Sequence, residues 1–279
     1  MPTAADFDHQ LARAEGLFPL PQILARAAAR ARDPESTVDE VAAVLILDPT
    51  IVRTVIRLSN SAYFNRAAKS ETLAEAVQRV GLREILRLVG CSIAQSVYRR
   101  ELVHYRIPPE VFWESGIAAA LLMAALMRAR GGDEEAAYLA GLMREIGMVV
   151  IDQVLAAEKS PARWDCYGPV REWELAVAGR AHPEIGAELL TRWTFAPEVC
   201  AAVRHQWEMG AAGGELARAL HLTNLVLERC GCDFSLPLGP FEPYAALVTE
   251  LSLNTEDLAA AHAEARDRFV RLRQELGAA

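Results

Sequence analysis

Positive charge is in short supply in this 279-residue sequence. The chain holds 29 Lys and Arg against 37 Asp and Glu, a formal net charge of −8. A protein that grips nucleic acid regardless of sequence needs a broad basic face. The charge balance therefore disfavours nucleic acid as a partner, although it is compatible with a local basic patch.

Cysteine is sparse and irregularly spaced, with five residues at positions 91, 166, 200, 230 and 232. An odd count in a chain of this length disfavours a disulfide framework and favours a reducing, cytoplasmic location. Cys230 and Cys232 form the only close pair, but no second pair or histidines follow at the spacing of a zinc site. We predict no metal and no cofactor.

The sequence also lacks the signals of export, membrane insertion and common catalytic loops. A cationic segment followed by an apolar one, which would mark a signal peptide, is missing at the N-terminus. The longest apolar run, Gly116 to Met127, is too short to cross a bilayer and predicts a buried helix, so no membrane partner is expected. No Gly-rich phosphate loop, nucleophile elbow or Cys/His catalytic pattern is visible.

What is present favours helices. Hydrophobic residues make up 52% of the chain and aromatic residues 7%, with Ala and Leu abundant. Helix starts are indicated by capping-box spacing at Thr37–Glu40 and Thr72–Glu75, by Asp48–Pro49, and by Thr255 as the cap of a last helix. Leu17–Pro21 predicts an extended entry, because proline disfavours helix in the residue before it.

The fold class predicted from this pattern is all-α, since no alternation typical of strands continues beyond a few residues. The proline pair at Arg106–Pro109 separates two helical patterns. We expect an N-terminal helical bundle over residues 1–106 and a second helical domain, with a C-terminal helical extension, over residues 107–279.

A set of short motifs, weak singly but specific in this order, gives the chain a family resemblance. They are Leu20–Pro21, Leu47–Pro49, Leu58–Phe64, Val80–Arg83, Val111–Trp113, Leu139–Leu142, Ile146–Gly147, His182–Gly186, Leu189–Leu190 and Arg192–Trp193. Over about Leu17 to Trp207 the chain resembles the HDOD domain, the HD-related output domain of bacterial signalling proteins. The resemblance implies an N-terminal helical bundle, a C-terminal bundle similar to HD phosphohydrolases, and a regulatory role.

The resemblance also locates the positions that hold a metal in HD phosphohydrolases, namely a His, a His-Asp pair and a later Asp. The matching residues here are Ser115, Arg144, Glu145 and, by a less specific match, Asn224. Two unit positive charges about 4 Å apart repel by roughly 4 kcal/mol at an effective dielectric constant of 20, and a divalent ion doubles that. Arg144 therefore either repels a metal or points away, and we predict that the protein is not an enzyme.

Two interpretations of the altered pair are open. Arg144 and Glu145 are adjacent on an expected helix, so they are not expected to pair with each other. In the first interpretation, each of the two side chains finds a separate partner. In the second, Arg144 binds an anionic ligand through its planar guanidinium group. His182 and His205 complete the candidate ligand-binding set, because related hydrolases with extra metal ligands carry histidines there; the alternative is a capping or buried histidine.

Two further features allow alternative functions. Arginine recurs every four residues at Arg79, Arg83 and Arg87. If the helix continues through Gly81, these residues form a basic stripe that could bind nucleic acid. The alternative is a solvated helix face on which they pair with Glu75 and Glu84. Asn60, Tyr63 and Phe64 end a helix with polar and aromatic groups, which serve an interaction surface or the core.

The leading hypothesis is a non-catalytic, cytoplasmic signal-transduction module that acts through signalling proteins as partners. The first alternative is a sensor that binds a nucleotide or another anionic small ligand in the altered HD pocket. The second is a nucleic-acid-binding regulator that uses the arginine stripe.

Overall fold

The computed structural model describes residues 2–17, 19–60, 69–98, 100–208, 213–231 and 233–277. Within these ranges the regular structure is helical, and the one β feature is an isolated bridge between Leu102 and Ile107. The prediction of an all-α fold is therefore confirmed.

The helices, in chain order, are α1 (Ala4–Leu17), α2 (Pro19–Arg32), α3 (Val38–Leu45), α4 (Pro49–Ser59), α5 (Leu73–Val80), α6 (Leu82–Tyr98), α7 (Pro109–Arg130), α8 (Glu134–Met143), α9 (Ile146–Ala157), α10 (Val170–Ala178), α11 (His182–Arg192), α12 (Pro197–Arg204), α13 (Gly214–Cys230), the 3-10 helix η1 (Glu242–Tyr244), α14 (Ala245–Glu250) and α15 (Thr255–Gly277).

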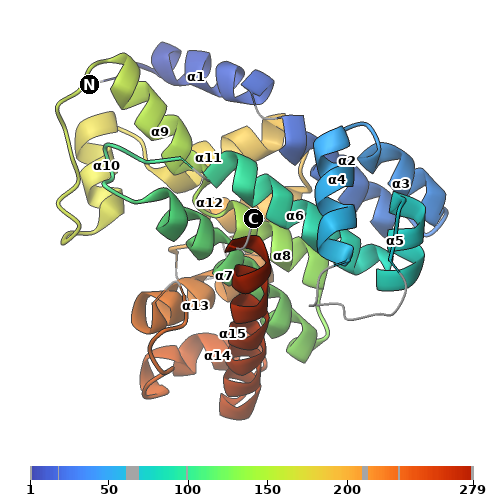
Figure 1. The fold of residues 1–279 in the computed structure, drawn as a ribbon. Coiled ribbons are helices and arrows are strands. Elements are labelled where there is room, and N and C mark those ends of the chain that lie inside the picture. The colour runs from blue at the N-terminus through green and yellow to red at the C-terminus, as the bar shows by residue number, and fades with distance from the viewer. Residues whose placement is uncertain are drawn as a thin grey trace.

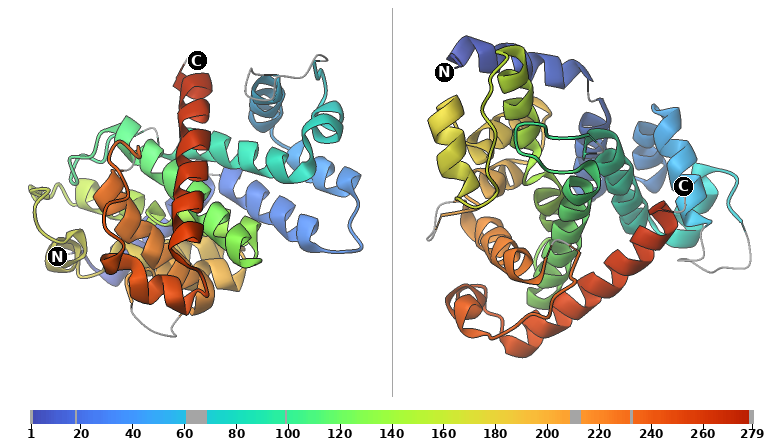
Figure 2. Two further views of the ribbon diagram at one scale, coloured as in Figure 1. Left: turned by 90° about the horizontal axis from the view of Figure 1, so that it is seen from below. Right: turned by 60° about the vertical axis from the view of Figure 1, so that its left-hand side comes forward.

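Helix α7 forms the centre of the molecule, with α6, α8, α13 and α15 packed around it (Figures 1 and 2). Every residue from Phe112 to Met127 is buried, which confirms the predicted buried helix. By length and composition alone α7 is apolar enough to cross a membrane, yet 83% of its most apolar window is buried inside the protein. The helix ends at Gly131, which adopts the left-handed conformation that glycine accepts most readily.

Helices α2 to α6 gather on one side of α7, and α9 to α12 lie on the other (Figure 1). Helix α1 crosses to the second group and packs against α9 and α11. The Phe7 side chain of α1 is buried there beneath the Arg180 guanidinium. The division into domains at residues 106 and 107 stays a prediction.

Most helix starts follow the sequence signals. Thr37 and Glu40 form the predicted reciprocal capping box. At α5 the Thr72 side chain accepts from the Glu75 backbone N–H, whereas the Glu75 carboxylate accepts from the N–H of Glu71 instead of Thr72. Both caps satisfy backbone donors that the first helical turn leaves unpaired.

Two predictions about helix starts are wrong. The described residues of the segment Leu17–Pro21 are helical rather than extended, because α1 continues to Leu17 and α2 begins at Pro19. Both prolines fall in the first turn of α2, where the missing N–H has no intrahelical partner to lose. The last helix is capped by Asn254 rather than Thr255: its side chain accepts from the N–H groups of Glu256 and Asp257.

Asn60 has a structural role at the end of α4. Its side chain exchanges two hydrogen bonds of 2.7 Å with the backbone of Ser70 and accepts one from Arg79. Asn60 thereby ties the end of α4 to the start of the segment that leads into α5. Tyr63 and Phe64 lie outside the described residues.

Candidate functional site

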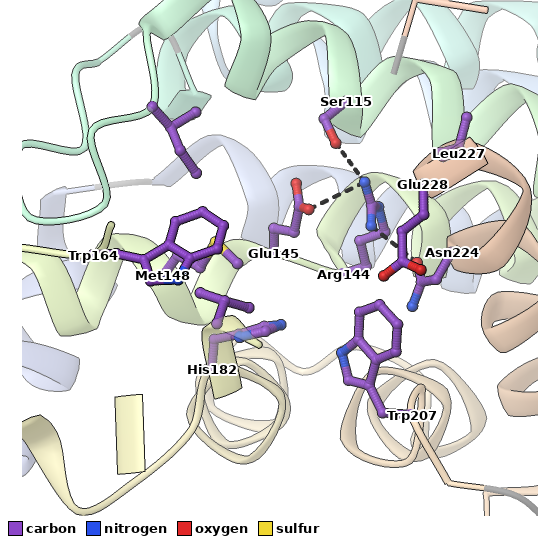
Figure 3. Close-up of a pocket in the computed structure, with 12 residues that line it drawn as sticks. Ser115, Arg144, Glu145, Met148, Trp164, His182, Trp207, Asn224, Leu227 and Glu228 are labelled. Atoms are coloured by element: carbon purple, nitrogen blue, oxygen red, sulfur yellow. Dashed lines mark hydrogen bonds and ion pairs between the residues drawn. The ribbon is translucent and has the colours of Figure 1, made fainter. Parts of the chain in front are cut away.

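A cavity of about 240 Å³ opens between α7, the α8–α9 junction, α11 and α13 (Figure 3). Its walls are mostly apolar, with a cluster of polar side chains on one side. The lining residues are Ile107, Ser115, Arg144, Glu145, Met148, Trp164, Val170, His182, Trp207, Asn224, Leu227 and Glu228. Ser115, Arg144, Glu145 and Asn224, which the sequence matched to HD metal positions, therefore meet in one place.

The helix expected to carry both Arg144 and Glu145 is broken at this pair. Helix α8 ends at Met143 and α9 begins at Ile146, with Glu145 at φ −106° and ψ 7° between them. Because the helical register is lost at this point, the two neighbouring side chains turn to the same side. An ion pair of 3.1 Å joins Arg144 Nη2 to Glu145 Oε1, so the expectation that they would not pair is wrong.

Arg144 points inward and joins the other matched positions together. Its Nη1 donates to Asn224 Oδ1 at 2.9 Å, and its Nη2 donates to Ser115 Oγ as well as pairing with Glu145. The side chain is buried, so these are charge-assisted contacts shielded from water. The side chains of Ser115, Glu145 and Asn224 thus converge on the Arg144 guanidinium (Figure 3).

Gln206, which the sequence interpretation missed, supports this arrangement from behind. It is fully buried, and its Nε2 donates to the backbone oxygens of Arg144 (2.9 Å) and Val203 (3.1 Å). Asn224 Nδ2 donates to Gln206 Oε1 at 3.1 Å. Gln206 therefore fixes both the Arg144 backbone and the orientation of the Asn224 amide. Nothing local in its sequence distinguishes it from an exposed glutamine.

His182 reaches the cavity from the start of α11, backed by a buried carboxylate. Its Nδ1 lies 2.8 Å from Glu174 Oε2, and its backbone N–H donates to the same oxygen at 2.9 Å. Tyr105 donates its hydroxyl to Glu174 Oε1 at 2.7 Å; burial, followed by the nearby Glu174 charge, raises the pKa of Tyr105 well above its ordinary value. The carboxylate holds the His182 ring in one orientation.

His205 is not part of this cavity. It lines a separate hollow beside Arg204 and Cys200, and its Nδ1 lies 2.9 Å from Glu208 Oε2. The expectation that His205 would line the same pocket as Ser115 and Arg144 is therefore wrong. It lies at the end of α12, and Trp207, two residues later, is the side chain that reaches the cavity instead.

The side chains present do not fit a metal ion. Across the part of the chain that the structure describes, no group of three or more His, Cys, Asp or Glu is arranged to hold one. Arg144 supplies a positive charge at the centre of the residues that the sequence matched to HD metal positions, and Ser115 and Asn224 accept hydrogen bonds from it. A divalent ion would have to displace a guanidinium held by three side chains.

The arginine stripe is also altered by the fold. Gly81, at φ 93°, ends α5, so Arg79 and the two later arginines do not share one helix. Arg83 pairs with Glu134 and Glu135, while Arg87 pairs with Glu134 at 2.8 Å and Glu84 at 3.2 Å. The three arginines therefore do not form the continuous basic face that nucleic acid would need, because the helix is interrupted and Arg83 and Arg87 are paired with acidic side chains.

The helical fold, with a polar cluster at the junction of α8 and α9, is that of an HD-related helical domain. The HDOD domain family model matches residues 17–209. The chain belongs to the HDOD family, and the resemblance inferred from the motifs is confirmed.

Solved structures of similar fold agree. A "Putative phosphohydrolase" from Shewanella amazonensis SB2B is 21% identical with a TM-score of 0.68, covering 96% of this chain and 98% of that one. An "HDOD domain protein with unknown function" from Geobacter sulfurreducens is 18% identical with a TM-score of 0.64, covering 94% and 97%. A "Putative signal transduction protein" from Marinobacter aquaeolei VT8 is 20% identical with a TM-score of 0.66, covering 98% and 65%.

A relative from Treponema pallidum (strain Nichols), named only "Uncharacterized protein", is 25% identical over 203 residues. The match covers 69% of this chain and 38% of that relative. The chain therefore spans well under half the length of the curated relative.

Proposed function

We propose that this protein is a non-catalytic regulatory module of the cytoplasm that acts by binding signalling proteins. The observation that carries the proposal is the position of Arg144. Its guanidinium joins Ser115, Glu145 and Asn224, the residues that the sequence matched to the HD metal positions, into one bonded cluster. A hydrolytic site of this class needs a metal with an open position for water.

The hydrolysis test compares the wild-type chain with Glu145→Gln and His182→Gln, assayed on bis(p-nitrophenyl) phosphate and on cyclic dinucleotides with Mg²⁺ or Mn²⁺. We expect the three proteins to give the same background rate. Elemental analysis of the purified chain should find far less than one bound metal ion per molecule. Turnover that falls on changing Glu145 or His182 would sink the non-catalytic proposal.

A candidate surface for partner binding lies in the turn between α3 and α4. Ile46 and Leu47 are adjacent aliphatic residues with 58% and 61% of their surface exposed. Burying such a pair against a partner releases water from apolar surface and favours association. Family membership supports a regulatory role, and this pair gives it a place to be tested.

The partner test is capture of proteins from the native cell on the immobilised chain, followed by measurement of the affinity of the purified partner. A double change, Ile46→Ser with Leu47→Ser, should weaken that affinity about tenfold or more. Leu236→Ser, a change at an aliphatic residue 56% exposed on the loop after α13, is the matched control. A partner that binds all these proteins equally places its interface elsewhere, and a chain that captures none contradicts the proposal.

Nucleic-acid regulation is the weaker alternative, because Arg83 and Arg87 are already paired with acidic side chains of α6 and α8. It would require salt-sensitive binding that falls when both arginines are removed.

A further inference from the structure

The polar side of the cavity leaves a carboxylate oxygen available as a hydrogen-bond acceptor, and Trp207 Nε1 is an unpaired donor on the same wall among the described residues. Arg144 is only 6% exposed, and both of its terminal nitrogens are engaged by Ser115, Asn224 and Glu145. Glu145 uses its Oε1 for the ion pair, and its Oε2 has no hydrogen-bond partner among the described residues. The terminal nitrogens of Arg144 are thus engaged within the protein, while a carboxylate oxygen remains for a ligand.

His182 adds a second acceptor. It is 1% exposed, and the Glu174 carboxylate beside its Nδ1 draws the ring proton to that nitrogen. Its Nε2 has no hydrogen-bond partner among the described side chains, and the ring extends toward the cavity (Figure 3). Glu174 accepts from Tyr105 and from two donors of His182, and these contacts hold the ring in this orientation.

The charges on the wall also favour a cation. Glu145 and Glu228 oppose the single positive charge of Arg144 at the cavity. Burial raises the pKa of Glu228, an effect that the Arg144 charge opposes. An entering phosphate would meet two carboxylates and a guanidinium that is already paired, which disfavours an anion.

Two indole rings complete the site. Trp164 and Trp207 line the cavity from separate segments, with His182 between them in the close-up (Figure 3). Indole faces attract cations, and ammonium or guanidinium groups are commonly held by aromatic rings beside a carboxylate. The volume of about 240 Å³ lies below the roughly 300–1,000 Å³ of sites for drug-sized ligands.

We propose that this cavity binds a small organic cation, an ammonium or guanidinium on a short apolar stem, that donates to Glu145 and His182 between Trp164 and Trp207. The stem would lie against the apolar lining, such as Met148. This occupant differs in charge from the anionic ligand suggested by Arg144 in the sequence, because the fold turns Arg144 inward.

The test is calorimetric titration of the full chain with agmatine and putrescine, with tryptophan fluorescence as a second readout. 1,4-Butanediol serves as the neutral match to putrescine, and AMP and inorganic phosphate are the anionic probes. We expect saturable binding of at least one amine and about tenfold weaker binding, or none, of the diol and the anions.

Variants locate the site. Glu145→Gln and Trp207→Leu should each weaken amine binding about tenfold, while their circular dichroism stays that of the wild type. Glu158→Gln, at the far end of α9 and roughly 20 Å along the helix, is the matched control and should bind as the wild type does.

Each alternative result overturns the proposal. Tighter binding of AMP or phosphate than of either amine would assign the cavity to anions. Equal binding of putrescine and butanediol would remove the role of charge. Amine binding that survives Glu145→Gln and Trp207→Leu would place it elsewhere, and absence of amine binding at millimolar concentration would leave the cavity without this ligand.

Discussion

Replacing Arg144 with methionine tests whether the guanidinium is the centre of the polar cluster. Methionine keeps much of the length and packing of the arginine stem but removes the charge and every donor. The change leaves Ser115 Oγ, Asn224 Oδ1 and the Glu145 carboxylate without their partner. We expect a large loss of stability for a single substitution.

The magnitude follows from the contacts. Hydrogen bonds to a charged group contribute about 1.5–3 kcal/mol each, and Arg144 makes two of them besides its ion pair. Removing a buried charge also recovers part of its desolvation cost, which offsets some of this loss. The expected net decrease in the free energy of unfolding is about 3–5 kcal/mol, a large share of the roughly 5–15 kcal/mol typical of a folded domain.

Urea unfolding followed by circular dichroism measures the change, with Arg83→Met as the matched control. The Arg83 side chain is 63% exposed and forms surface ion pairs, so its loss should cost less than about 1 kcal/mol. Adding Glu145→Gln to Arg144→Met should recover part of the loss, because the unpaired carboxylate is then gone. A cost below about 1 kcal/mol for Arg144→Met, or strict additivity with Glu145→Gln, would refute the central role of Arg144.

Three further changes probe the surroundings. Gly147→Ala should destabilise the protein by about 3 kcal/mol or more, because its Cβ would collide with the His182 backbone oxygen; Gly168→Ala, with nothing within 4 Å, should be nearly neutral in the same urea assay. Burial lowers the pKa of His262 below its ordinary 6.5, so its contribution to stability is full above pH 6.5 and is lost as the pH falls through the lower folded value. The free energy of unfolding of His262→Leu should therefore decrease less than that of the wild type between about pH 7 and pH 5. An unchanged slope would contradict this. The last change rebuilds the matched metal positions with Ser115→His, Arg144→His, Glu145→Asp and Asn224→Asp. We expect this variant to fold and to bind Mn²⁺, as measured by elemental analysis. A folded variant without metal would show that bringing these four positions together is not sufficient for metal binding.

Local signals were sufficient for most of the fold. The capping box at Thr37, the Thr72 side-chain cap and the apolar run of α7 each act through neighbouring residues, so the sequence predicted them. The resemblance also located Asn224, although it lies 80 residues from Arg144 in the chain. Its hydrogen bond to Arg144 agrees with that weakest part of the match.

The site was harder to predict because its details depend on backbone direction and distant packing. A two-residue break at Arg144 and Glu145 reversed the expected relation of their side chains. Gln206 and Glu174 act from behind the cavity, and neither spacing nor composition distinguishes them from surface residues. His205 followed the pattern of a ligand, but the end of α12 turned it to another hollow.

The cation at the centre of this cluster is tethered to the chain by a covalent side chain, whereas a metal ion must be captured from solution. Its occupancy therefore does not vary with the supply of metal in the cell, and a chelator has nothing to extract from that position. The cluster around Arg144 is complete as soon as the chain has folded. Folding alone therefore sets the position of this positive charge, with no separate loading step.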